Sequence, residues 1–196
     1  MLGEATIRLA VRTPSDEDNL IRLCVEGQQG AFDTLVARHY RGIHSMVYRM
    51  LGNAEDASDL TQETFLRAYA RLETFQRGRS FLAWLRRIAT NLCIDHLRRR
   101  GKPDVSLDER LALGSQHADP RSAERPEERV EMSEASNRVM AAVHRLPEKQ
   151  RAVLVLRHME GLKLEEIASD LRLPLGTVKT LLFRGRRAVR RMVGEL

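Results

Sequence analysis

The sequence predicts an all-α protein with two small helical domains joined by a flexible linker, the C-terminal domain containing a helix-turn-helix. Aromatic residues make up 5% of the 196 residues, against 42% hydrophobic residues, so the cores must be mainly aliphatic, which favours packed helices over a β-sandwich. Apolar residues recur at helical spacing along most of the chain, and no stretch alternates as a strand would. An acidic, proline-containing stretch separates two basic regions.

The apolar spacing predicts four helices in the first half of the chain, over residues 16–26, 31–51, 53–71 and 80–100. Gly27 and Gly30 end the first of them, because glycine favours turns over helix continuation. In the fourth helix, Leu82, Leu85 and Ile88 fall on one face and are expected to point inward. Trp84 lies among these residues, so both a core position and a stacking role are open to it.

The middle of the chain predicts a linker. Residues 103–135 hold nine acidic residues and four arginines, with Pro103, Pro120 and Pro126 among them. Sparse apolar residues without a sustained period are typical of a segment that stays mobile unless a partner orders it. The resulting division is an N-terminal extension over 1–15, a helical domain over 16–101, a flexible linker over 102–130 and a second domain over 131–196.

Residues 161–191 have the pattern of a helix-turn-helix. A short amphipathic helix carrying small Ala168 is followed by the break Leu173-Pro174-Leu175-Gly176, and Thr177 is expected to cap a basic second helix. The start of that second helix would enter the DNA major groove, where its side chains can read base edges. The candidate −35 DNA-binding residues are Lys179, Thr180, Phe183, Arg184 and Arg187. The alternative is a solvated basic face on an ordinary helical hairpin.

Residues 55–69 place a polar, mostly acidic flank on one helix. Asp56, Asp59, Gln62 and Glu63 share that flank. Leu60, Phe65 and Leu66 are expected to face inward. A negative face on a protein with net charge +6 suits a protein partner better than DNA, although an ordinary helix surface remains the alternative.

Four runs in this order resemble the small extracytoplasmic-function (ECF) group of bacterial sigma factors: DLTQETFLRAY, FQRGRSFLAWLRRIATNLCIDHLRR, LPEKQRAVLVLRHMEGLKLEEIASDL and GTVKTLLFRGRR. The resemblance covers nearly the whole chain except about residues 1–15 and the linker. It implies a transcription initiation factor that directs RNA polymerase core to promoters by reading duplex −35 DNA and melted −10 DNA. It also implies docking on the β and β′ subunits and control by an anti-sigma factor.

The resemblance implies roles for matched positions. The polymerase-binding residues would be Asp56, Asp59, Gln62, Glu63 and Phe65. The −10 DNA-binding residues would be Phe75, Arg77, Arg79, Ser80, Arg86, Arg87, Thr90, Asn91, Arg98 and Arg99. Many members of the family carry an arginine where this chain has Leu181, and this departure leaves the −35 sequence preference open.

Two other classes of protein fit the sequence less well. A dimeric repressor or activator would need a dimerising helix or a ligand pocket, and neither has an obvious signature. An enzyme would need grouped catalytic residues, but the six histidines are scattered and no glycine-rich phosphate loop is present. Cys24 and Cys93 lie far apart, so no disulfide or zinc framework is predicted. We therefore expect a cytoplasmic protein without a cofactor, a metal or a membrane span.

Overall fold

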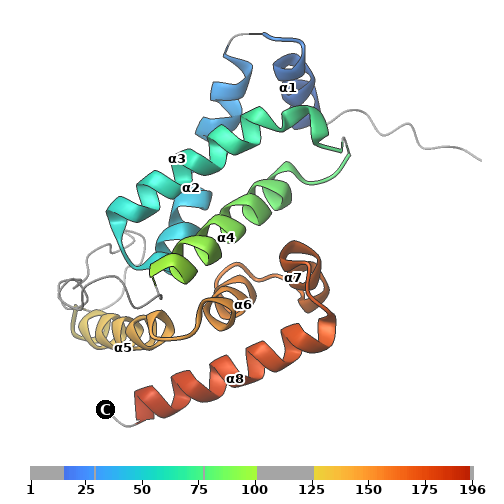
Figure 1. The fold of residues 1–196 in the computed structure, drawn as a ribbon. Coiled ribbons are helices and arrows are strands. Elements are labelled where there is room, and N and C mark those ends of the chain that lie inside the picture. Colours follow the sequence, from blue (N-terminus) through green and yellow to red (C-terminus); the bar gives the residue numbers. More distant parts are fainter. Residues whose placement is uncertain (1–15, 29, 77, 101–125, 195–196) are drawn as a thin grey trace, which may run out of the picture.

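The computed structural model describes residues 16–28, 30–76, 78–100 and 126–194, with the side chains of the last range described from Glu134 onward. The regular secondary structure of these residues is entirely helical, which confirms the predicted fold class (Figure 1). The elements are α1 (Asp16–Val25), α2 (Ala31–Leu51), α3 (Ala54–Ala70), the short 3-10 helix η1 (Leu72–Thr74), α4 (Phe81–Arg100), α5 (Pro126–His144), α6 (Glu148–His158), α7 (Leu164–Leu171) and α8 (Leu175–Gly194).

Local sequence explains the ends of the N-terminal helices. Gly52 ends α2 at φ 76°, and its N–H donates to the carbonyl of Tyr48. Asn53 then caps α3, its side-chain oxygen accepting from the N–H groups of Glu55 and Asp56. These two signals place a sharp turn between α2 and α3, because glycine tolerates a positive φ and asparagine satisfies the free amides of a new helix.

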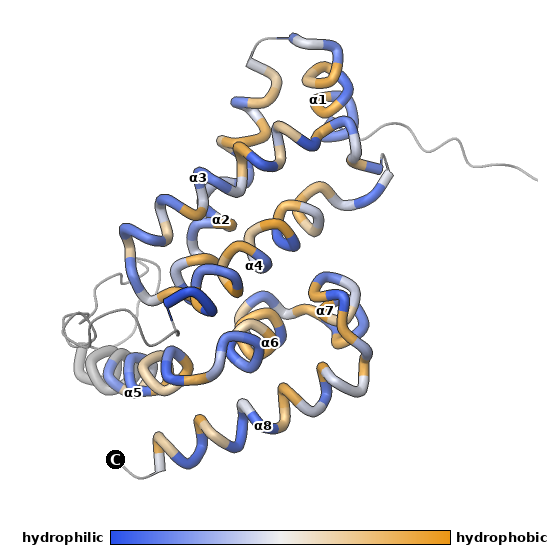
Figure 2. The backbone as a smooth tube through the Cα atoms, in the orientation of Figure 1, coloured by the Kyte–Doolittle hydropathy of each residue, from blue (hydrophilic) through white to orange (hydrophobic). Residues whose placement is uncertain are grey.

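The C-terminal domain is built around α6. Residues 151–156 of this helix are all buried, and α5, α7 and α8 pack against it. The side chain of Ile167 on α7 and those of Val178 and Leu182 on α8 are buried with it. Hydrophobic and hydrophilic stretches alternate along α8, as in an amphipathic helix with one face on this core (Figure 2).

The turn of the helix-turn-helix differs from the sequence prediction. Arg172, in the left-handed region at φ 52°, ends α7, and α8 already begins at Leu175. Thr177 therefore lies inside the first turn of α8 and is not its N-cap. The prediction placed the whole Leu173–Gly176 segment in the break. Pro174 is compatible with an earlier helix start, because the N–H that proline lacks would have no partner at the beginning of a helix.

The second difference concerns the linker. Residues 1–15 and 102–125 lie outside the described residues, whereas α5 begins at Pro126. The last five residues of the range predicted as a linker, 126–130, are therefore helical. Proline favours the first turn of a helix because its missing N–H would be unpaired there in any case.

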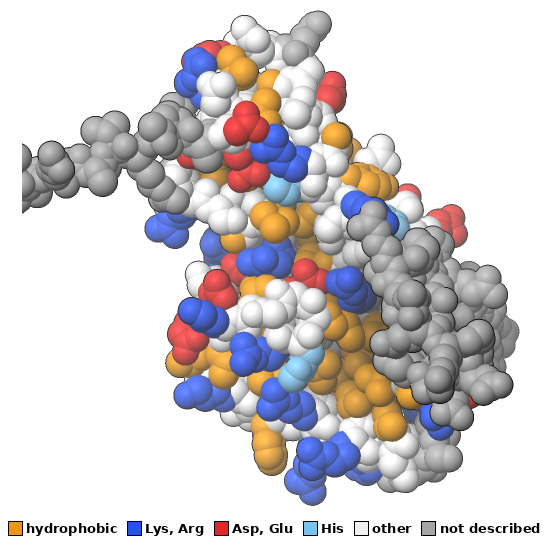
Figure 3. All heavy atoms as spheres, turned by 180° about the vertical axis from the view of Figure 1, so that it is seen from behind, with side chains coloured by type: hydrophobic (Ala, Val, Ile, Leu, Met, Phe, Trp, Pro, Cys, Tyr) orange, Lys and Arg blue, Asp and Glu red, His pale blue; other side chains and the backbone are white. Residues whose placement is uncertain are grey.

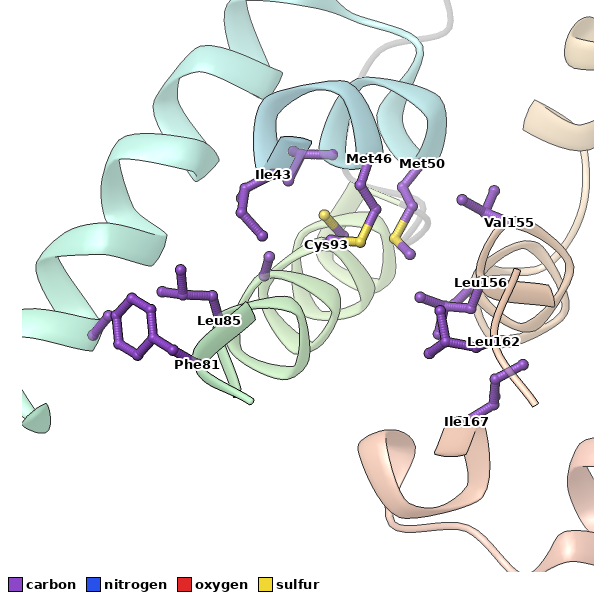
Figure 4. Close-up of a cluster of buried hydrophobic side chains, with 14 of the residues drawn as sticks. Ile43, Met46, Met50, Phe81, Leu85, Cys93, Val155, Leu156, Leu162 and Ile167 are labelled. Carbon is purple, nitrogen blue, oxygen red and sulfur yellow. The ribbon is translucent and has the colours of Figure 1, made fainter. Parts of the chain in front are cut away.

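One hydrophobic core runs through both halves of the chain (Figure 4). Met46 and Met50 of α2 and Cys93 of α4 lie toward Val155 and Leu156 of α6, and each of these side chains is at most 1% exposed. Burial of this extent makes hydrophobic contact the main force that holds the two helical groups together.

Polar contacts tie the same two groups at the C-terminal end of α2. Arg151 donates from Nη1 to the carbonyl of Met50 at 2.9 Å, and Arg49 forms a 2.6 Å ion pair with Glu160. His144 donates from Nε2 to the carbonyl of Arg49 at 3.0 Å. Burial lowers the pKa of His144, although the hydrogen bond to Arg49 acts in the opposite direction, so the neutral ring donates as its Nε2–H tautomer.

Candidate nucleic-acid interface

The exposed face of α8 carries the candidate −35 residues. Lys179, Thr180, Phe183, Arg184 and Arg187 are all exposed, and Phe183 keeps 66% of its surface accessible. These positions share one side of the helix, given its 3.6-residue period. Lys and Arg side chains gather over this end of the molecule (Figure 3), so α8 offers cations and one apolar ring on a single accessible surface.

The opposite face of α8 fixes its orientation. Gly185 is buried, and a Cβ at this position would meet Leu154 Cδ1 at 3.4 Å, so the glycine allows α8 to approach α6 closely. Leu181 is half-buried and packs against the core. The side chain at this departure from the family pattern thus contributes to packing, while its neighbour Thr180 stays exposed.

A second candidate surface lies at the start of α4. Ser80 caps the helix by accepting from the N–H of Ala83 at 3.2 Å. Phe75, Phe81 and Trp84 then form a cluster of rings with centroids 5.4–5.7 Å apart. Phe81 is fully buried, whereas Trp84 is only half-buried, so the indole combines a core contact with an accessible edge.

Basic side chains surround this aromatic cluster. Arg79, Arg86 and Arg87 line the same groove as Trp84, which has a volume of about 860 Å³. Arginines beside an aromatic ring form the kind of groove that binds a single-stranded nucleic acid, by phosphate contact and base stacking.

The structure separates the predicted −10 residues into accessible and inaccessible ones. Asn91, Arg98 and Arg99 are exposed on α4. Phe75 is 7% exposed and Thr90 is 0% exposed, so neither side chain presents a surface to DNA in this arrangement. Helical periodicity explains Thr90, because it follows buried Ala89 on the inward side of α4. Arg77 lies outside the described residues.

The candidate polymerase-binding face on α3 is also mixed. Asp59 and Gln62 are exposed, and Glu63 is paired with Arg67 at 2.6 Å. Asp56 instead contacts the side chains of Arg100 and His96, so its carboxylate ties α3 to the end of α4.

Leu66 on α3 departs from the inward orientation expected from the sequence, and Phe65, predicted as a polymerase-binding residue, is buried and offers no surface to a partner. Leu66, expected to face inward, is 58% exposed, whereas Phe65 is 5% exposed and stacks on Tyr40 at 6.2 Å. Tyr69 is 60% exposed and meets Phe32 edge-on at 4.9 Å. The spacing of Gln62, Leu66 and Tyr69 could have indicated this exposed stripe, because residues at i, i+4 and i+7 lie on one side of a helix.

These residues border an apolar groove of about 560 Å³ between α3 and the first two helices. Exposed apolar side chains that continue a polar, accessible helix face are typical of a surface that binds another protein. The groove extends the candidate polymerase-binding face beyond the residues that the sequence singled out.

The described residues offer neither a metal site nor a membrane-spanning helix. They contain no group of three or more metal-ligating side chains, and none of their helices combines the length and apolar character needed to cross a bilayer. Burial raises the pKa of Cys93 to about 12, so this thiol stays protonated and unreactive near neutral pH.

Family models match both halves of the chain. The Sigma-70 region 2 model matches residues 35–102, a range that contains the α3 face and the α4 groove. The Sigma-70 region 4 model matches residues 136–189, a range that contains the helix-turn-helix. The candidate surfaces on α3 and α4 therefore fall within one family region, and the surface on α8 falls within the other.

Relatives and solved structures agree with these matches. The ECF RNA polymerase sigma factor SigW of Bacillus subtilis is 41% identical over 90% of this chain and 96% of its own length. The RNA polymerase sigma-H factor of Pseudomonas aeruginosa is 34% identical over 90% of this chain and 93% of its own. The structure of CnrH in complex with the cytosolic domain of CnrY matches with a TM-score of 0.62 and 26% identity, covering 91% of this chain and 97% of that one.

A co-crystal structure of the sigma factor RpoE with the anti-sigma factor NepR from Bartonella quintana has the same fold. It matches with a TM-score of 0.63 at 20% identity, over 83% of this chain and 96% of that one. The 41% identity to SigW over 90% of this chain and the two family models lead to one conclusion. The chain belongs to the extracytoplasmic-function group of RNA polymerase sigma factors.

Proposed function

We propose that this sigma factor divides its work among three surfaces, each carried by a different helix. As a member of its family it directs RNA polymerase to promoters. In our proposal α8 reads −35 duplex, the groove at α4 holds melted −10 DNA, and the α3 face binds polymerase. The observation that carries the proposal is the exposure of five DNA-competent side chains on one face of α8, opposite a face buried in the core.

The proposed recognition of −35 DNA rests on the chemistry of the exposed α8 residues. Arg184 and Lys179 can donate to guanine edges, and the Phe183 ring can meet a thymine methyl group. Thr180 donates to the carbonyl of Gly176 at 2.9 Å, which leaves its oxygen free to accept. Arg186, also exposed, donates to His158 at 3.0 Å, which suits a phosphate contact at fixed register better than a base contact.

The proposed binding of melted −10 DNA rests on the groove at α4. Unstacking a base costs a few kcal/mol, which the groove must offset. Arg79, Arg86 and Arg87 offer phosphate contacts, and the accessible edge of Trp84 offers stacking. Asn91 adds an amide that both donates and accepts. It donates to the carbonyl of Arg87 at 2.9 Å, and its side-chain oxygen remains available to a base.

The proposed binding of polymerase rests on the polar stripe of Asp59 and Gln62 and on the adjoining apolar groove with Leu66 and Tyr69. Two solved relatives are described in complexes with CnrY and with the anti-sigma factor NepR. We propose by analogy that an anti-sigma factor controls this chain as well. The chain would act in the cytoplasm, where polymerase works, by binding alone and without catalysis.

The test is assembly with core polymerase followed by run-off transcription. The full chain should co-elute with core polymerase in gel filtration, and the resulting holoenzyme should start transcripts at promoters mapped after overexpression. The double variant Asp59→Ala/Gln62→Ala should lose co-elution, whereas Glu134→Ala, at an exposed position on α5, should retain it. A chain that binds duplex DNA tightly alone and never joins polymerase would instead be a conventional regulator.

A further inference from the structure

The groove at α4 has two walls of opposite charge. One wall belongs to the candidate −10 surface and carries Arg79, Arg86 and Arg87. The other wall belongs to α7, the first helix of the helix-turn-helix, and carries Glu165, Glu166 and Asp170. Because α7 packs beside α4 (Figure 1), the acidic face of one domain lies over the basic pocket of the other.

The closest contact across the groove joins Arg86 to Asp170. Their side chains lie 3.5 Å apart and are only 15% and 13% exposed. The Arg86 Nε and Asp170 Oδ2 atoms are buried, and neither has a hydrogen-bond partner in the part of the chain that the structure describes. Each charge therefore depends mainly on the other for compensation.

We propose that α7 is an internal competitor of melted promoter DNA, with its carboxylates lying where DNA phosphates would lie. The proposal rests on the proposed −10 role of the α4 groove. Arginine pairs with carboxylates and phosphates through the same charge-assisted geometry, so Asp170 and a phosphate cannot both occupy Arg86. In the closed arrangement the groove is unavailable to a single strand, and the domains must separate before it can bind.

Two further features concern the selectivity of this closure and the strength of its ion pair. The candidate −35 residues of α8 are exposed, and none of them lines the groove, so the −35 surface stays accessible while the −10 surface is covered. Burial raises the pKa of Asp170 even though Arg86 acts in the opposite direction. The carboxylate is thus incompletely compensated, and a partly desolvated ion pair of this kind contributes little net stability to the closed form.

The sole tryptophan of the chain, Trp84, lines the groove and reports on closure. Quenching of its fluorescence by acrylamide, a neutral probe, should rise in Asp170→Arg, because two arginines would then face each other. Glu134→Arg makes the same change in charge at an exposed position on α5, and its Trp84 fluorescence should be quenched to the same extent as that of the natural chain. The swap Arg86→Glu/Asp170→Arg should return quenching to the original level. Far-UV circular dichroism and thermal melting identify any variant that fails to fold, in which case Asp170→Asn replaces it.

The second measurement is binding of a fluorescein-labelled single strand of mixed sequence, followed by anisotropy at fixed salt. If the closed form holds about 90% of the molecules, opening should tighten binding by about tenfold, since apparent affinity scales with the open fraction. Asp170→Arg should show this gain, and Glu134→Arg should show only the small gain that any added positive charge gives. Binding of the corresponding duplex should change equally in both variants.

The outcomes separate this inference from the proposed function. Increased quenching with tighter single-strand binding in Asp170→Arg alone supports internal competition. Unchanged quenching and unchanged affinity, in a natural chain that binds the single strand, overturn the competition and leave the −10 role standing. Increased quenching with no single-strand binding by any variant overturns both, because the opened groove then has no affinity for nucleic acid.

Discussion

Replacement of Arg151 by methionine tests how the two helical groups are held together. Arg151 is 8% exposed, and it donates to three carbonyls: Met50 in α2 at 2.9 Å, Leu146 at 3.3 Å and His144. Methionine has a similar length but no donor, so three largely buried carbonyls would lose a partner, at about 1 kcal/mol each. Burial lowers the pKa of Arg151 to about 10, so removal of this desolvated charge returns part of that loss.

The net expectation is a fall of about 2 kcal/mol in the free energy of unfolding, or about 4–8 °C in Tm for a chain of this size. Urea unfolding followed by circular dichroism measures the first quantity, and a thermal melt measures the second. Arg145→Met is the matched control, because Arg145 is exposed beside the same loop, and it should change stability by less than about 0.5 kcal/mol. Equal stability of the Arg151→Met variant and the natural chain would refute this role for the guanidinium.

Three other predictions concern single sites. Gly52→Ala should destabilise the chain by about 2 kcal/mol in urea unfolding, because φ is 76° and the new Cβ would lie 2.7 Å from the His144 ring; a neutral change would contradict the close contact. Cys93 and Cys24, both buried with raised pKa values, should resist alkylation by N-ethylmaleimide at neutral pH and react in urea, so rapid labelling of the folded chain would refute their burial. Asn91→Ala should reduce permanganate reactivity of the −10 region about tenfold with unchanged co-elution with polymerase, and unaltered reactivity would remove Asn91 from the −10 site.

The helices were predictable because their signals are local. Residues 31–51 form one helix with the predicted bounds, since the apolar stripe ends at Gly52. Asn53 and Arg71 sit just outside α3 as its caps. The α8 surface was predictable for the same reason, because Lys179, Thr180, Phe183, Arg184 and Arg187 follow the helical period, and all are exposed.

The remaining features depend on contacts between distant parts of the chain. Thr90 looks polar in sequence, but α4 turns it into the core, and Leu66 looks apolar, but α3 turns it outward. The 3.5 Å contact between Arg86 and Asp170 joins residues on separate domains. No periodicity or composition indicates which charges meet across a domain interface, so the closed arrangement and the acidic cover on the −10 groove emerged only from the structure.

Transcription by Arg184→Ala holoenzyme tests the division of labour among the three surfaces most directly. Arg184 is exposed on α8 and contacts neither the core nor the α3 face. Loss of one base contact costs about 1–3 kcal/mol, so run-off transcription from a mapped promoter should fall about tenfold or more while co-elution with core polymerase stays at the natural level. Arg138→Ala, at an exposed position on α5, should leave both unchanged. Loss of polymerase binding by Arg184→Ala would contradict the assignment of DNA reading and polymerase docking to separate helices.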